Sequence, residues 1–152
     1  MLNSSHDVST LNSLIATTLD SVNGYREASA DAESGRFQSI FTNRAAEREQ
    51  CVSSLREAVR RLGGEPEDDG TALAGAHRAF VNLKSAVTGR DDQAIINEVE
   101  RGEDHIKSKF EAALDDNQLG AEARAAVTAA WGSVKSGHDE MSALKHSMEG
   151  AR

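Results

Sequence analysis

Apolar side chains recur alternately three and four residues apart over long stretches of this chain. In the first stretch the positions are Leu11, Ile15, Thr18, Val22 and Tyr25, with threonine and tyrosine as semi-polar members. Such spacing places the whole set on one face of an α-helix, whereas a half-buried β-strand repeats every second residue. The chain contains one proline, so little interrupts long helices. The sequence therefore predicts an all-α protein built from long amphipathic helices.

Turn-forming residues divide this pattern into five predicted helices. The strongest boundary is the run Leu62-Gly63-Gly64-Glu65-Pro66, in which a glycine takes the left-handed conformation and the proline cannot continue a helix. Asp7 or Ser9 is expected to cap the first helix, and Asp91 or Asp92 to begin the fourth. The predicted helices span approximately residues 7–30, 36–62, 71–87, 91–115 and 121–148.

Four of these helices are long, and the connections between them determine the topology. At about 1.5 Å per residue they reach roughly 35–45 Å, the length of a four-helix bundle. Short turns make the first two helices antiparallel to each other, and the last two likewise. The short helix 71–87 is predicted to cross the bundle, so that helices 36–62 and 91–115 run parallel. One such crossover is the ferritin-like topology, which we expect to form a single domain over residues 1–152.

Charge and composition exclude several classes of protein. The 152 residues include 17 basic and 25 acidic side chains, a net charge of −8, which disfavours nucleic acid because phosphates attract basic surfaces. The one cysteine, Cys51, allows no intramolecular disulfide and no thiolate zinc site. No run approaches the ~18 apolar residues of a membrane span, and the first residues lack the apolar region of a signal peptide. We expect a cytoplasmic protein without membrane contact.

Several short motifs, taken in order, resemble a known family. The motifs are Asp20…Gly24-Tyr25, Arg48-x-Gln50, Leu62-Gly63-Gly64-x-Pro66, His77-Arg78-x-Phe80, Leu83…Thr88-Gly89, Glu100-Arg101-Gly102-Glu103-Asp104 and His138-Asp139. Over about residues 8–147 the chain is similar to the bacterial ferritin-like four-helix-bundle proteins grouped as domain of unknown function 2383. Phe80 departs from the tryptophan that the family often has at this place. The resemblance implies the bundle fold and suggests a stress-associated role.

The ferritin-like topology raises the question of a di-iron site. Such a site takes one glutamate from each of two helices and a Glu-x-x-His pair from each of the other two. None of the five histidines follows a glutamate by three residues, and Asp20 and Glu27 lie opposite the apolar stripe of the first predicted helix. An iron-binding oxidase or iron-handling protein remains the alternative hypothesis. The residues that come nearest to its metal ligands are Glu49, Glu100, Glu103 and His138.

Polar residues also occupy stripe positions on all four long helices, namely Tyr25, Arg48, Glu103 and His138. Because a buried charge is costly unless it is paired, we expect Arg48 and Glu103 to pair. The planar guanidinium can hold a carboxylate with two hydrogen bonds. We interpret the four residues as a buried polar network that fixes the helix register. The cationic Arg48 would repel a metal ion, so this interpretation includes no cofactor.

The leading hypothesis is therefore a non-enzymatic ferritin-like bundle, stress-associated or acting through a protein partner that the sequence does not identify. Ferritin-like bundles often pair through exposed helix faces, so the pattern is compatible with a homodimer. A small-molecule binder that uses the polar interior beside Tyr25 and His138 is a third hypothesis. The sequence assigns no catalytic residue, and it leaves open whether His77 and Cys51 do more than pack.

Overall fold

The computed structural model describes residues 4–67 and 92–150. Within these ranges 88% of the residues are helical and none lies in a strand, which confirms the predicted all-α class. The predicted crossover helix 71–87, with His77, lies outside the described residues. The helices are α1 (Ser4–Asp31), α2 (Gly35–Arg61), α5 (Asp92–Leu114) and α6 (Ala121–Gly150). None of the described helices is long and apolar enough to cross a membrane.

Local signals determine where α2 begins and ends. Ser34 precedes the helix, and its side chain accepts a hydrogen bond from the backbone N–H of Phe37 at 3.4 Å, as a serine N-cap does. Gly63 has a φ of 84°, the left-handed conformation expected of the helix stop, and its N–H donates to the carbonyl of Arg60 at 3.0 Å. The predicted range 36–62 therefore differs from α2 by one residue at each end.

The first helix begins earlier than predicted. α1 already includes Ser4, so neither Asp7 nor Ser9 is its N-cap. Asp7 is instead buried, and its Oδ1 accepts a hydrogen bond from the backbone N–H of Gly120 at 3.0 Å. Gly120 immediately precedes α6, where unpaired backbone N–H groups attract a negative side chain. Asp7 thus ties the first turns of α1 to the start of α6.

An equivalent tie is present at the opposite end of the bundle. Asp92, one of the two predicted starting residues, is the first residue of α5. Its carboxylate accepts hydrogen bonds from the backbone N–H groups of Glu33 at 2.9 Å and Ser34 at 3.1 Å. Both donors lie in the turn between α1 and α2. The start of α5 is therefore held beside the start of α2.

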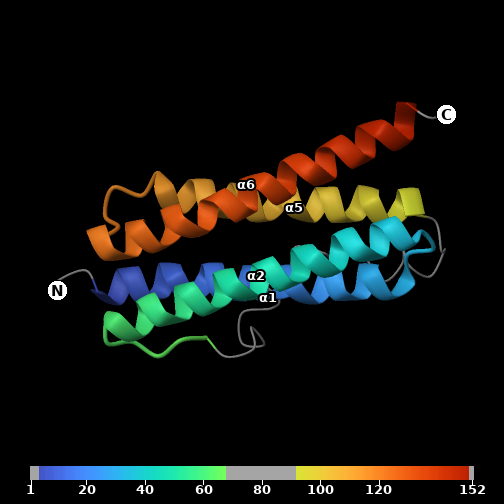
Figure 1. Ribbon diagram of the computed structural model, residues 1–152. Helices are drawn as coiled ribbons and strands as arrows, with labels where there is room; N and C mark the ends of the chain where they lie inside the picture. Colours follow the sequence, from blue (N-terminus) through green and yellow to red (C-terminus); the bar gives the residue numbers. More distant parts are fainter. Residues whose placement is uncertain (1–3, 68–91, 151–152) are drawn as a thin grey trace.

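Figure 1 shows α2 and α5 running in one direction and α1 and α6 in the other. Two contacts agree with this course. Asp92 at the start of α5 contacts the α1–α2 turn, and Asp116, just after α5, lies 2.6 Å from His6 near the start of α1. α1 and α6 each pack along both α2 and α5, whereas α2 and α5 do not adjoin. The predicted parallel course of α2 and α5 is confirmed, and the two helices lie diagonally across the bundle.

Two clusters of buried apolar side chains form the core. One cluster includes Leu11 and Phe110, toward the end where α1 begins. The other includes Phe41, toward the opposite end. Along α2 and α5 the change from one cluster to the other falls at Arg48 and Glu103, which are both fully buried. A polar layer therefore divides the core at its middle.

Candidate functional site

The centre of the polar layer is an ion pair between α2 and α5. Arg48 Nη1 donates to Glu103 Oε1 at 2.9 Å, and Arg48 Nη2 donates to Glu103 Oε2 at 2.7 Å. Neither side chain has any exposed surface. The two parallel hydrogen bonds are the arrangement in which a guanidinium and a carboxylate interact most strongly. The pair spans the bundle diagonally and joins the two helices that do not adjoin.

Groups from α1 and α6 complete the layer. Tyr25 Oη donates to Glu103 Oε1 at 2.7 Å, and the hydroxyl of Ser21 accepts from Arg48 Nη1 at 2.8 Å. Arg48 Nη2 also lies 3.5 Å from the carbonyl oxygen of Ser133 on α6. The carboxylate thus receives three donors, which compensate for its removal from water.

The charges in this layer set its protonation state. Burial and the negative charge of Glu103 raise the pKa of Tyr25 well above its ordinary value. Burial alone would lower the pKa of Arg48, but its attraction to the carboxylate of Glu103 raises it above the usual range. At neutral pH Tyr25 is therefore a neutral donor and Arg48 a cation. The layer is built to hold one charge pair and one neutral hydroxyl donor.

A glycine on α6 makes room for the ion pair. A Cβ atom at Gly137 would lie 2.3 Å from Arg48 Nη2 and 2.9 Å from Glu103 Oε2. The apolar stripe of this helix pointed to the next residue, His138, so Gly137 was not among the residues predicted to form the site. An interior helical glycine is costly, and this cost is the signal that could have identified the position.

The hydroxyl of Tyr25 gives a testable prediction. Tyr25→Phe removes a hydrogen bond to a charged group, so we expect the free energy of unfolding at neutral pH to fall by about 1.5–3 kcal/mol. The raised pKa keeps Tyr25 protonated in the folded state, while an unfolded tyrosine ionises near pH 10. The stability that depends on this proton is therefore lost as the pH rises above about 10.

Denaturation at a series of alkaline pH values, with Tyr25→Phe as the reference, measures this effect. The stability advantage of the wild type over the variant should shrink above about pH 10. Tyr25 is the only tyrosine, so tyrosinate absorbance reports on this residue alone. Ionisation of the folded protein at the pH of a free tyrosine would contradict the prediction.

His138, predicted as the fourth member of the network, lies outside it. Its Nε2 is 2.6 Å from Asp104 Oδ1, and its Nδ1 is 3.3 Å from Asp139 Oδ1. Its side chain is 16% exposed, at the boundary between α5 and α6. The physical reason is helix geometry: Gly137 faces the bundle axis, and the next residue is rotated about 100° away from it. The interpretation of His138 as a core residue was wrong.

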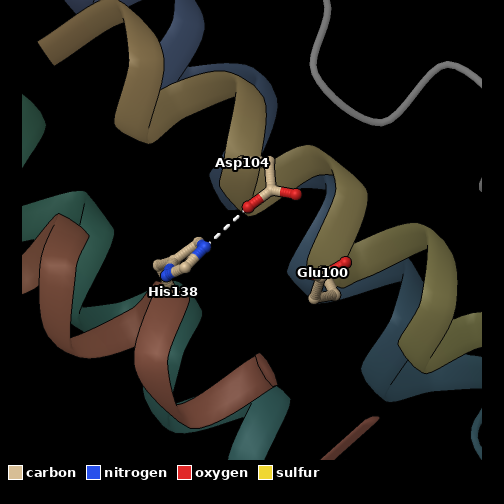
Figure 2. A group of neighbouring side chains, drawn as sticks. All are labelled: Glu100, Asp104 and His138. Carbon is tan, nitrogen blue, oxygen red and sulfur yellow. Dashed lines mark hydrogen bonds and ion pairs between the residues drawn. The ribbon is translucent and has the colours of Figure 1, made fainter. Parts of the chain in front are cut away.

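The structure also separates the four predicted metal ligands. Glu49 is exposed on α2 and pairs with Arg26 of α1, while Glu103 belongs to the central ion pair. Glu100 and His138 do come together, and Asp104 joins them. As Figure 2 shows, Asp104 on α5 and His138 on α6 point toward each other, and Glu100 lies near them on α5; one ligand atom of each residue lies within 4.8 Å of those of the other two. Asp104 was not among the predicted ligands.

Cys51 lies beside a shallow groove between α2 and α6. The groove has a volume of about 220 Å³, and Ser133 and Ala130 are among its other lining residues. Burial raises the pKa of the Cys51 thiol, which keeps the sulfur protonated at neutral pH. A protonated thiol is a poor nucleophile and a poor metal ligand.

Comparison with known proteins places the chain in a family. The model of the family described as Domain of unknown function (DUF2383) matches residues 7–116, a range that includes most of α1, all of α2 and α5, and both partners of the central ion pair. No curated protein matches the chain. Because the match covers more than half of the chain, the protein belongs to the family described as Domain of unknown function (DUF2383).

Proposed function

We propose that this protein is a non-enzymatic helical bundle that acts through contact with a protein partner, and that its central ion pair takes the place of a metal centre. The observation that carries the proposal is the two-bond contact between Arg48 and Glu103, both fully buried. A cation at the bundle axis and a carboxylate with three donors together form a structural layer. Such a layer fixes the register of the helices.

A di-iron centre does not fit the residues at the bundle axis. It requires carboxylates and imidazoles that project inward from all four helices. Here the axis carries the Arg48 guanidinium, whose positive charge disfavours a metal ion nearby. Glu103 already accepts hydrogen bonds from Arg48 and Tyr25. The side chains of this layer therefore support a structural role and not an iron-dependent oxidation.

The function that we propose depends on the outer surface of the bundle and not on its buried polar layer. Tyr25, Arg48 and Glu103 have no exposed surface, so a soluble substrate would reach them only if the helices separated. The net charge of −8 favours a partner with a basic surface, because complementary charge speeds and orients association. The stress-associated role and the cytoplasmic location are further parts of the proposal, which the family resemblance and the sequence composition support.

Iron content tests the proposal. Protein produced in iron-rich medium and purified without chelator is expected to carry well below one iron per chain, because a bound metal needs most of its ligands placed in advance. Elemental analysis and the absorption spectrum measure this. The His138→Ala variant, prepared in parallel, separates metal on the surface from metal at the axis. Two irons per chain with a carboxylate-bridged absorption band would overturn the proposal.

A further inference from the structure

The group formed by Glu100, Asp104 and His138 has the composition and placement of a metal site. Glu100 and Asp104 are four residues apart on α5 and therefore lie on one face of that helix. His138 approaches them from α6 (Figure 2), and its Nε2 lies 2.6 Å from Asp104 Oδ1. Ligands from two packed helices hold their positions without the help of a loop.

The donor chemistry distinguishes this group from an ordinary acidic patch. One imidazole and two carboxylates are ligands that zinc accepts, whereas calcium and magnesium take oxygen ligands almost entirely. Ligands bound to one zinc ion stand about 2.0–2.2 Å from it. Ligand atoms that already lie within 4.8 Å of one another need only a small rotation of their side chains to meet on one ion.

The surroundings of His138 are those of a metal-bound histidine. Its second ring nitrogen, Nδ1, lies 3.3 Å from Asp139 Oδ1, and a carboxylate in this position orients the ring so that Nε2 faces the metal. Asp139 is not one of the three ligands, and it is itself held by Lys135 at 2.8 Å. The side chains of Glu100 and His138 are only 14% and 16% exposed, so little of either is free to turn into solvent.

We propose that Glu100, Asp104 and His138 bind a single divalent transition-metal ion of the zinc type at the surface between α5 and α6, with water at the remaining coordination positions. Two interactions compete with the ion. The imidazole and Asp104 now share a hydrogen bond, and the Lys145 ammonium lies 3.5 Å from Glu100 Oε2. Metal binding displaces both interactions.

Calorimetric titration of the full chain with Zn²⁺ tests the proposal. The wild type is expected to show one saturable site, and Ca²⁺ to bind at least about tenfold more weakly. His138→Ala and Asp104→Asn should each lower the zinc affinity more than about tenfold, and Asp139→Asn by roughly tenfold. Lys145→Gln should raise the affinity several-fold, because it removes the competing charge.

His6 provides a matched control. Its Nε2 lies 2.6 Å from Asp116 Oδ2, the same distance as in the His138–Asp104 pair, but no third ligand joins that pair among the described residues. His6→Ala should leave the zinc affinity unchanged, and imidazole NMR signals should shift on zinc addition for His138 and not for His6. Circular dichroism of the metal-free variants checks that each one folds.

Two results would overturn the proposal. The first is a His138→Ala variant that is folded and binds zinc as the wild type does. The second is equal affinity for Zn²⁺ and Ca²⁺, which would reveal attraction to acidic side chains without a site. Neither result bears on the iron content of the bundle axis, so this inference and the proposed function fail independently.

Discussion

Replacing Arg48 by leucine is expected to lower the free energy of unfolding by about 3–5 kcal/mol. The substitution leaves Glu103 fully buried and without either guanidinium hydrogen bond. Glu103→Leu should have an effect of similar size, because it leaves the buried guanidinium of Arg48 without its carboxylate partner. Chemical denaturation followed by circular dichroism measures both changes.

The double variant Arg48→Leu, Glu103→Leu separates a broken pair from lost packing. With both charges gone, no buried ion remains uncompensated, so much of the lost stability should return. The coupling energy expected for residues in contact is about 0.5–3 kcal/mol. Losses that simply add would show that the two side chains do not interact in solution, whatever the cost of each substitution alone.

Gly137→Ala is expected to destabilise the protein by about 1–3 kcal/mol through overpacking. The added methyl group would lie 2.3 Å from Arg48 Nη2 and 2.9 Å from Glu103 Oε2. Both atoms belong to a hydrogen-bonded pair that cannot shift without loss of its geometry. The expected sign is opposite to the usual effect of alanine in place of glycine inside a helix, which is stabilising by up to about 1 kcal/mol.

Gly132 is the control for this substitution. It lies on the same helix, and a Cβ there meets nothing within 4 Å. Gly132→Ala should therefore show only the gain in helix propensity and raise the free energy of unfolding by up to about 1 kcal/mol. Opposite signs at the two glycines, measured by the same denaturation assay, would locate the effect at the polar layer. Stabilisation by both substitutions would contradict the structure of that layer.

Much of the fold could be predicted because its signals are local or periodic. The apolar stripes of α1 and α5 indicate which face of each helix packs in the core, and Gly63 indicates where α2 ends. The positions of Arg48 and Glu103 within apolar stripes also predict that the two residues pair, since a buried charge requires a partner. In the structure the two side chains lie in contact.

Other features depend on distant parts of the chain and have no local signal. In the sequence Asp7 resembles an ordinary helix N-cap. Its carboxylate instead accepts a hydrogen bond from the backbone N–H of Gly120, which lies 113 residues away in sequence. Ser21 has a small hydroxyl that no pattern marks, although it accepts from Arg48. His138 misled the prediction because a helical stripe is broad, and one residue of rotation separates the bundle axis from the α5–α6 boundary.

The polar layer also limits the order in which substitutions can accumulate during evolution. Arg48 cannot be lost while Glu103 remains, and Gly137 cannot gain a side chain while the pair stands against it. Each single step passes through a less stable protein, and proteins have little stability to spare. A lineage can therefore remodel this polar layer only by coordinated substitutions on α2, α5 and α6. Single substitutions on the exposed helix faces do not face this constraint.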